Sequence, residues 1–510
     1  MAKINKTPGV YIEEISAFPN SIAQVETAIP AFVGYTEKAT YNNQEVTLKP
    51  TRLSSFGEFL RYFGDAPKTT YSIENVRQQD PNKPYKIKPQ GNRYLLFYSM
   101  KLFFANGGSV CYIVSVGDYQ DAITQSRLAE GIQTLEPAHE PTMLVIPDAV
   151  LLEQQECYVL QQTMLAHCAS QRNRIAILDI FDGFKERAPG DDVISAFRTG
   201  IGNEHLQWGA AYYPWVETNI VGADEVNLTN IDNGSIMAFI GLLQEDIELQ
   251  VKAGLLKQTQ ADDINAVIER LRPTQSKLLE KVGEVDRNKI TSKKDIHQTL
   301  LATHPLYKEI MQSVREHLSL LPPSGGMAGI YTMVDNTIGV WQSPANVSMN
   351  SVVKPAVNIT SDEQEDLNVP LDGKAVNAIR TFPGKGVLVW GARTLDGNSG
   401  EWRYISVRRT ATFIEQSVKS TAEAYVFEPN NANTWTSLNA MISNFLTNLW
   451  REGALAGAKP EDAFFVNIGL GTTMTPVDIL EGWMKVNIGI AVARPAEFIV
   501  INLQQRMQPA

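Results

Sequence analysis

The sequence predicts a multi-domain protein of the α/β class, in which helices and strands are mixed along the chain. A length of 510 residues allows roughly two to four domains. The hydrophobic content of 44% and the charged content of 20% are ordinary for a chain with packed cores. Between about residues 29 and 218, short apolar segments alternate with amphipathic ones. This alternation is typical of a parallel sheet that helices cover on both faces.

Residues 29–218 form the first predicted domain. Its predicted strands are residues 31–36, 109–116, 142–150, 174–180 and 210–216. Its predicted helices are residues 91–108, 120–135 and 153–171. Residues 36–93 are polar and contain prolines, so we expect a loop there with one short helix within 54–64.

Residues 219–321 are predicted to be a helical insertion. Ile236, Ile240 and Leu243 recur at helical spacing, and so do Ile310 and Val314. The sequence PPSGG at 322–326 predicts a chain break. Residues 322–369 are then expected to connect the insertion to the next domain.

Residues 370–493 are predicted to form a C-terminal domain of mixed strands and helices. We expect strands at 384–394, 402–409 and 486–492, the last because apolar and small residues alternate there. Two amphipathic helices are expected near 414–426 and 435–449. Thr475, Pro476 and Asp478 predict the start of a third helix.

Both ends of the chain carry a strand-like segment, within 1–28 and within 494–510. The residues concerned are Val10, Tyr11, Ile12, Glu13, Glu14 and Ile15 at one end and Phe498, Ile499, Val500, Ile501 and Leu503 at the other. No hairpin signal follows the first segment, so we expect these strands to pair with other copies of the chain. Head-to-tail contacts of this kind close into rings or extend as helical filaments.

Charge and composition exclude several classes of protein. The chain has 45 Lys plus Arg against 56 Asp plus Glu, a net charge of −11, which argues against a nucleic-acid binder. Its 3 cysteines have no paired spacing, so a disulfide framework is not expected. The N-terminus lacks an apolar signal core, and no apolar run approaches the roughly 20 residues of a membrane span. We expect a soluble protein that folds in the cytoplasm, without insertion into a membrane.

Motifs for enzymatic chemistry are mostly missing. The best candidates are Asp148, Asp179 and Asp182, which fall at the ends of predicted strands, where open α/β sheets bind ligands. Carboxylates there could hold Mg²⁺. The simpler interpretation is that Asp148 and Asp182 cap the helices or turns that follow them. The sequence GLGTTM at 469–474 lacks the third glycine of a dinucleotide loop. We therefore predict no catalytic residue, no cofactor and no bound metal.

Several segments, in order along the chain, resemble contractile tail sheath proteins of phages and phage-like injection systems. The N-terminal ones are TPGVYIEEI, IPAFVGYTEKA and YLLFYSMKLFFANGGSVCYIV. The later ones are PPSGGMAGIYTMVD, GVWQSPAN, AVNAIRTFPGKGVLVWGARTL, EWRYISVRR and TPVDILEGWMKVNIGIAVARPAEFIV. The matches extend over nearly the whole chain, and residues 219–321 are the part that resembles the family least.

This resemblance implies a structural function without catalysis. Sheath subunits stack as hexameric rings around an inner tube in an extended, metastable state, and they contract to drive the tube through a target envelope. The implied partners are further copies of the chain, the inner tube protein, and baseplate and terminator proteins. The implied location is a phage-tail-like particle that is assembled in the cytoplasm and in some systems released from the cell.

The resemblance also implies roles for parts of the chain. The terminal segments become arms that exchange strands between neighbours, 370–493 becomes a core domain facing the tube, and 29–218 becomes an outer domain. A helix of the core domain grips the tube in this family. The candidate residues here are Thr434, Trp435, Asn439, Trp450 and Arg451.

Two other functions remain open from the sequence alone. One is a metal-dependent α/β hydrolase that uses Asp148, Asp179 and Asp182. The other is a filament or shell protein that assembles but does not contract.

Overall fold

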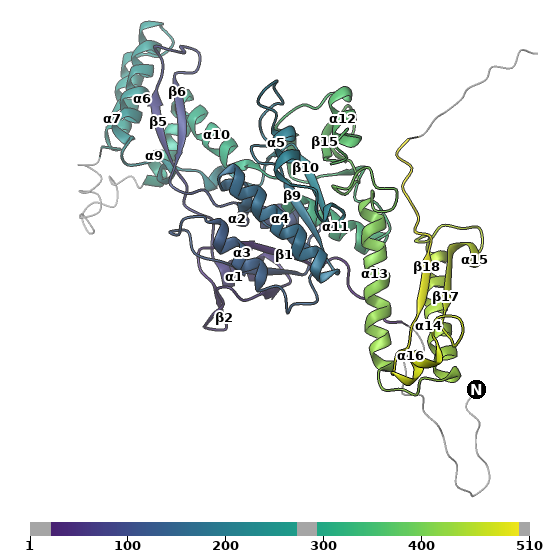
Figure 1. The fold of residues 1–510 in the computed structure, drawn as a ribbon. Coiled ribbons are helices and arrows are strands. Elements are labelled where there is room, and N and C mark those ends of the chain that lie inside the picture. Colours follow the sequence, from purple (N-terminus) through teal and green to yellow (C-terminus); the bar gives the residue numbers. More distant parts are fainter. Residues whose placement is uncertain (1–21, 273–292, 499–510) are drawn as a thin grey trace, which may run out of the picture. The chain divides into compact units, whose positions relative to one another are not determined.

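The computed structural model describes residues 22–272 and 293–498, and it divides into two compact units. The large unit comprises residues 26–408, and the small unit comprises residues 409–498 with 22–25. The mixed α/β class predicted from the sequence is confirmed (Figure 1). The division falls after residue 408 rather than near the expected 370, because the strands that follow 370 join the sheet of the large unit.

A nine-stranded sheet forms the centre of the large unit. In spatial order its strands are β13 (Val347–Ser348), β16 (Gly386–Trp390), β15 (Asn377–Phe382), β10 (Gly209–Tyr213), β9 (Ile175–Asp179), β8 (Met143–Val145), β1 (Pro30–Gly34), β7 (Cys111–Ser115) and β4 (Thr51–Leu53). The strands from β15 to β7 run parallel, and antiparallel pairs complete both edges. The predicted central strands are therefore confirmed as a buried parallel sheet, but the strand expected at 142–150 ends at Val145, and a 3₁₀ helix follows over Pro147–Leu151.

Helices cover this sheet on both faces. They are α1 (Phe56–Phe63), α2 (Leu96–Ala105), α3 (Gln125–Gln133), α4 (Gln154–Gln171), α5 (Val193–Gly200) and α11 (Ser324–Thr337). The ring of Phe32 in β1 packs edge-on against Phe103 of α2, whereas the next residue, Val33, packs closely against Gly131 of α3. Successive strand residues point to opposite faces, so α2 and α3 lie on opposite sides of the sheet. Helix α11 packs beside α2, and α4 packs beside α3.

The segment PPSGG does not end a helix; it begins one. After Pro323, α11 starts at Ser324 and contains the glycines that were expected to break the chain. A Cβ at Gly325 would lie 2.7 Å from the carbonyl oxygen of Ser99, and one at Gly329 would lie 2.5 Å from that of Phe103. The glycines are therefore explained by the close approach of α11 to α2 rather than by a turn.

A mostly helical part of the large unit lies beyond this sheet. Its helices are α6 (Ile236–Lys252), α7 (Gln258–Glu269), α9 (Lys293–Thr303) and α10 (Pro305–Ser319). The hairpin of β5 (Thr70–Asn75) and β6 (Tyr85–Gln90) packs on α6 and α10. This hairpin was missed, since residues 36–93 were predicted to be loop with one short helix. Tyr71, Ile73 and Tyr85 bury their side chains, and these tertiary contacts stabilise the hairpin despite its prolines.

Shorter elements complete the large unit. They are β2 (Thr40–Tyr41) and β3 (Gln44–Glu45), which pair with each other, the sheet of β12 (Leu320–Leu321), β11 (Val216–Thr218) and β14 (Val352–Pro355), and the helix α12 (Ser361–Asn368). The described helices include none with the length and the apolar character that crossing a bilayer demands.

The boundary between the units falls inside α13 (Ile405–Ala422). The strand predicted at 402–409 is therefore wrong, because most of this segment is the first turn of α13. The guanidinium carbon of Arg408 lies 3.9 Å from the ring centroid of Trp402 and 4.5 Å from that of Trp208. This stacking, which the sequence alone does not reveal, favours the helical turn.

The small unit contains the rest of α13, three further helices and a pair of strands. They are α14 (Ala432–Arg451), α15 (Pro460–Ala463), α16 (Pro476–Leu480), β17 (Phe464–Asn467) and β18 (Asn487–Ile490). The predicted helices near 414–426 and 435–449 are confirmed, as is the predicted start of a helix at Thr475. Leu438, Ile442 and Leu449 bury the apolar face of α14.

Candidate functional site

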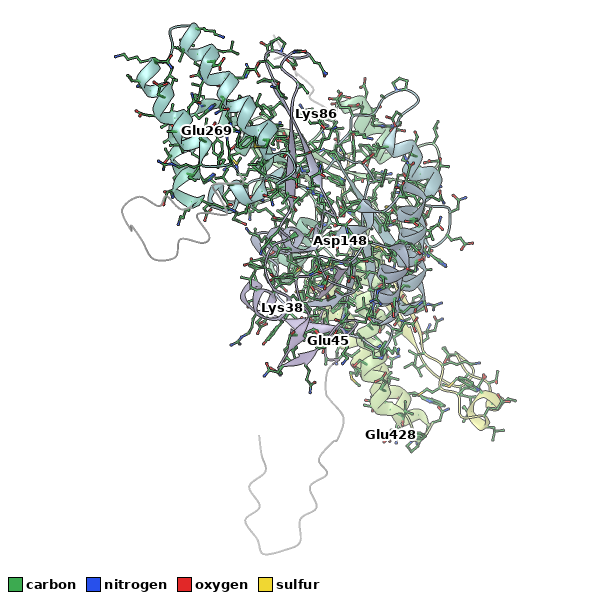
Figure 2. The ribbon with its side chains drawn as sticks, turned by 90° about the vertical axis from the view of Figure 1, so that its left-hand side faces the viewer. Lys38, Glu45, Lys86, Asp148, Glu269 and Glu428 are labelled. Atoms are coloured by element: carbon green, nitrogen blue, oxygen red, sulfur yellow. The ribbon has the colours of Figure 1, made fainter. Side chains whose placement is uncertain are left out.

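Asp148 is a buried carboxylate that holds other parts of the fold together. It lies in a short 3₁₀ helix, η1 (Pro147–Leu151), and Figure 2 shows it in the interior of the large unit. Its carboxylate accepts hydrogen bonds from the backbone N–H groups of Tyr35, at 3.1 Å, and of Leu95, at 2.7 Å. Leu95 is the N-cap residue of α2 and offers no side-chain cap of its own. Burial raises the pKa of Asp148 to about 6. The predicted local cap is therefore wrong, because Asp148 caps a distant helix.

Asp179 does the same for α11. It is the last residue of β9, and its carboxylate accepts hydrogen bonds from the backbone N–H of Ser324, at 2.9 Å, and from the Ser324 hydroxyl, at 2.5 Å. Ser324 is the first residue of α11, and the preceding Pro323 cannot cap it with a side chain. Burial raises the pKa of Asp179 to about 7. Both aspartates thus satisfy helix N-termini that the sequence leaves uncapped.

Asp182 has a different environment. Its backbone has a positive φ of 52°, and its carboxylate pairs with the Lys185 ammonium at 2.6 Å. Asp148, Asp179 and Asp182 are therefore not brought together into one site. Within the described ranges, no three His, Cys, Asp or Glu side chains are placed to hold a metal ion. The hydrolase alternative is not favoured by this geometry.

Added Mg²⁺ is accordingly expected to leave the melting temperature of the protein unchanged. Since both buried carboxylates already accept hydrogen bonds from helix N-termini, a cation would have to displace these bonds. The measurement is a thermal melt with millimolar Mg²⁺ and with EDTA. A rise with Mg²⁺ that Asp148→Asn or Asp179→Asn abolishes would contradict this account.

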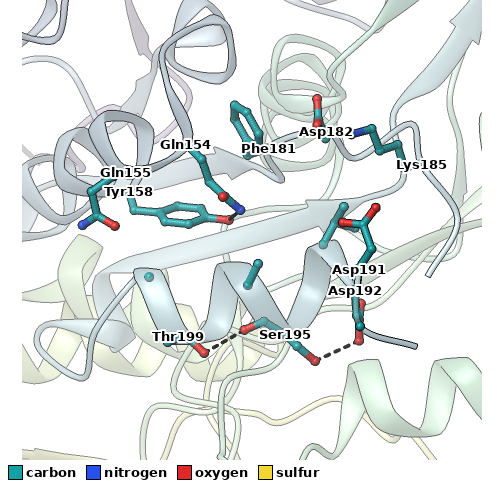
Figure 3. Close-up of a pocket in the computed structure, with 14 residues that line it drawn as sticks. Gln154, Gln155, Tyr158, Phe181, Asp182, Lys185, Asp191, Asp192, Ser195 and Thr199 are labelled. Atoms are coloured by element: carbon teal, nitrogen blue, oxygen red, sulfur yellow. Dashed lines mark hydrogen bonds and ion pairs between the residues drawn. The ribbon is translucent and has the colours of Figure 1, made fainter. Parts of the chain in front are cut away.

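A surface groove of about 780 Å³ lies between α4, α5 and the segment that follows β9 (Figure 3). Several of its polar side chains form hydrogen bonds or ion pairs with one another. Tyr158 accepts a hydrogen bond from Gln154 at 3.1 Å, and Ser195 donates to Asp192 at 2.8 Å. Burial tends to raise the pKa of Asp192, but hydrogen bonds from Arg187, Ser195 and the backbone outweigh it and lower the pKa to about 2. This carboxylate, which is charged at neutral pH, caps α5 by accepting a hydrogen bond from the backbone N–H of Ile194.

The segment GLGTTM forms a closed turn in the small unit. The N–H of Gly469 donates to the Thr473 hydroxyl at 3.1 Å, and the N–H groups of Thr473 and Met474 donate to the carbonyl oxygen of Gly469. The helix that follows, α16, has 5 residues. The backbone N–H groups that a phosphate would need are thus already used within the turn.

The small unit contains a two-stranded antiparallel sheet of β17 and β18. Phe465 pairs with Gly489 and Val466 with Ile488. Asn439 of α14 donates to the carbonyl oxygen of Val466 at 2.9 Å, which fixes the sheet on the helix. Among the described residues the sheet has no third strand. Such a pair offers edges at which further strands can add.

The ring of Phe465, which pairs with Gly489 across the two strands, leaves no room for a side chain at position 489. A Cβ at this position would overlap the ring of Phe465, which lies across the strand. We expect Gly489→Val to destabilise the small unit by about 1–3 kcal/mol, because the ring must move. Chemical denaturation measures this loss. The control is Gly241→Ala in α6, where a Cβ meets nothing within 4 Å, and it is expected to be neutral or stabilising. Equal effects of both substitutions would contradict this packing.

The residues predicted to face a tube lie on α14, but most of them are used within the small unit. The indole N–H of Trp435 donates to Asn430 at 2.7 Å, and that of Trp450 donates to the carbonyl oxygen of Gly457 at 3.0 Å. Arg451 is exposed, whereas Thr434 and Asn439 are half-buried. The exposed face of α14 is polar and almost uncharged, with Asn433, Thr436, Ser437, Asn444 and Asn448.

The predicted arm strands lie outside the described residues, with one exception. Phe498 is described, and its side chain is exposed. Val10, Tyr11, Ile12, Glu13, Glu14 and Ile15, and likewise Ile499, Val500, Ile501 and Leu503, are not described. Their pairing stays a prediction.

The phage tail sheath C-terminal domain family matches residues 398–506 of this chain. The tail sheath protein of Burkholderia phage BcepMu is 29% identical over 150 residues, which cover 28% of this chain and 30% of that protein. The tail sheath protein of Vibrio phage KVP40 is 24% identical over 143 residues, which cover 28% of this chain and 21% of that protein. The aligned parts are thus less than a third of these relatives.

Solved sheath structures match over the whole chain. The anti-feeding prophage helical sheath in the contracted state is 25% identical, with a TM-score of 0.60, and 99% of this chain and 100% of that chain are covered. The sheath complex of PVC, an extracellular contractile injection system, in the contracted state is 26% identical, with a TM-score of 0.59 and 99% of both chains covered. A chain of the anti-feeding prophage baseplate is 26% identical, with a TM-score of 0.58, and 99% of this chain and 100% of that chain are covered. The resemblance to contractile tail sheath proteins that the sequence predicts is confirmed.

Proposed function

We propose that this chain is the structural subunit of a contractile sheath. It assembles helically with copies of itself around an inner tube, in a metastable extended state, and contracts to drive the tube through a target envelope. The observation that carries the proposal is the match over 99% of the chain to sheath structures in the contracted state. The chain acts without catalysis, since its strand-end carboxylates cap helices.

The small unit supplies the connections between subunits. In our proposal the arms at 1–28 and 494–510 add as strands to the edges of the β17–β18 pair in neighbouring copies. The pair is short, β17 having 4 residues and β18 having 4. Each added strand therefore forms only a few main-chain hydrogen bonds, each contributing about 1 kcal/mol net. Such contacts are strong when repeated through a lattice, and they leave the large units free to rotate.

Other partners are the inner tube protein, the baseplate and a terminator protein. The exposed face of α14, which ends at Arg451, is our candidate for the tube contact. The particle is proposed to assemble in the cytoplasm and to resemble a phage tail. Energy for contraction is stored in the lattice as a kinetically trapped arrangement.

Co-expression with the tube protein tests this function. Negative-stain microscopy is expected to show striated hollow cylinders that are wider than the bare tube. The tube protein expressed alone is the control. Small, monodisperse particles in every preparation would contradict the proposal.

A further inference from the structure

Large apolar side chains are exposed on two neighbouring segments of the small unit. The exposed fractions are 58% for Val426, 102% for Phe427, 86% for Leu480 and 60% for Trp483. We call these residues the apolar turn patch. Single exposed apolar residues are common on protein surfaces, but a cluster of large ones marks an interaction site.

Hydrogen bonds hold the two segments of the patch side by side. The Asn430 amide donates to the carbonyl oxygen of Trp483 at 2.9 Å, and it accepts from the Trp435 indole at 2.7 Å. Figure 1 shows α16 beside the turn that follows α13. The Thr475 and Asp478 side chains cap α16 reciprocally. The patch is therefore preorganised, which lowers the entropy lost when a partner binds.

The surroundings of the patch are acidic. Glu428 follows Phe427, and Glu481 follows Leu480. Both glutamates are exposed, and Figure 2 shows Glu428 at the far end of α13. Lys485, two residues after Trp483, is paired with Asp478 at 2.6 Å. A partner that fits this surface combines apolar side chains with positive charge.

We propose that the first residues of the chain, 1–9, bind the apolar turn patch of a neighbouring copy. This segment has the matching chemistry, since Ile4 is apolar while Lys3 and Lys6 are positive. The inference rests on the proposed function, because it requires an assembled neighbour. Residues 1–9, which precede the predicted arm strand, would then form a second, partly electrostatic contact with the neighbouring copy.

The length of the segment permits this contact. The described chain begins at Ile22, and the N–H of Val25 donates to the Ser417 hydroxyl of α13 at 3.2 Å. The preceding residues, 1–21, can span about 70 Å when extended, at ~3.3 Å per residue. This exceeds the length of α13, whose 18 residues rise about 27 Å. The segment can therefore extend well beyond the point at which the described chain begins.

Cross-linking between two single-cysteine variants tests the contact. Ile4→Cys and a size-tagged Leu480→Cys are mixed, assembled with the tube protein and treated with a short bismaleimide reagent. Cys111, Cys157 and Cys168 are buried, so they do not compete. We expect a mixed dimer on a denaturing gel. The control replaces Leu480→Cys by Leu371→Cys, another fully exposed leucine, and is expected to give none.

Charge reversal provides the second readout. Lys3→Glu with Lys6→Glu is expected to lower the yield of mixed dimer about tenfold. Sheath that forms without the mixed dimer overturns the inference and leaves the proposed function standing. A cross-link found only within one chain, in an Ile4→Cys and Leu480→Cys double variant, also overturns it. Failure of every variant and of the unaltered chain to form sheath counts against the proposed function itself.

Discussion

A chain that lacks residues 1–16 is expected to fold and to form no sheath. The described strands and helices of the large unit begin at Pro30, so we expect this unit to keep its core without residues 1–16. The deletion removes the predicted arm strand at 10–15. Loss of about three main-chain hydrogen bonds at each contact costs about 3 kcal/mol, which weakens each contact on the order of a hundredfold. Negative-stain microscopy measures assembly, and a thermal melt measures folding.

Two proline substitutions provide a sharper version of this test. Neighbouring residues of a strand direct their N–H groups to opposite sides. If the strand pairs along one edge, either Tyr11→Pro or Ile12→Pro therefore removes a required donor. Ile12→Val is the matched control and is expected to assemble normally. Normal sheath from both proline variants, or from the deletion, would show that the arm is not needed.

Asp179→Ala is expected to destabilise the large unit on the order of 2–3 kcal/mol. The substitution leaves the N–H and the hydroxyl of Ser324 without their acceptor in a fully buried place. It also uncaps α11, which packs closely on α2. Urea denaturation measures the effect. Asp182→Ala, which removes a half-exposed ion pair, is the control and is expected to cost less than about 1 kcal/mol. Equal losses would contradict the capping role.

The same carboxylate makes stability depend on pH. Burial raises the pKa of Asp179 from 3.8 to about 7, so the folded state favours its protonated form. The stabilisation that the protonated Asp179 contributes to the folded state is fully present below about pH 4 and is lost as the pH rises through about 7. Asparagine does not titrate, so the Asp179→Asn variant lacks this pH dependence. We expect its free energy of unfolding, relative to that of the unaltered chain, to increase between pH 4 and pH 8. Burial lowers the pKa of His167 and of His317 to about 4, so their effect on stability has the opposite pH dependence. Both histidines are present in the variant and in the unaltered chain, so their effect cancels when the two stabilities are subtracted.

The central sheet could be predicted from the sequence because its strands are continuous apolar runs between amphipathic helices. The hairpin β5–β6 could not, since its prolines and polar residues resemble a loop and its stability comes from packing on distant helices. PPSGG has the composition of a turn, and only contact with α2 explains why it is helical. In these cases tertiary packing outweighed local propensity.

The candidate site was predicted only in part. The sequence indicated a strand near 486–492, but its pairing with β17 had no hairpin signal, because α16 lies between the two strands. The capping roles of Asp148 and Asp179 involve partners 53 and 145 residues away, which no local pattern reveals. The apolar turn patch was also missed, because the sequence does not reveal that the large apolar side chains of Leu480 and Trp483 are exposed.

Contraction is the central claim, and the axial rise per ring of assembled cylinders tests it most directly. Cylinders assembled on a tube are to be imaged by cryo-electron microscopy before and after a destabilising treatment such as mild acid or denaturant. The account predicts two discrete lattices built from one subunit fold, the second shorter and wider than the first. A single rise and diameter under all conditions would contradict it and would identify a filament that does not contract.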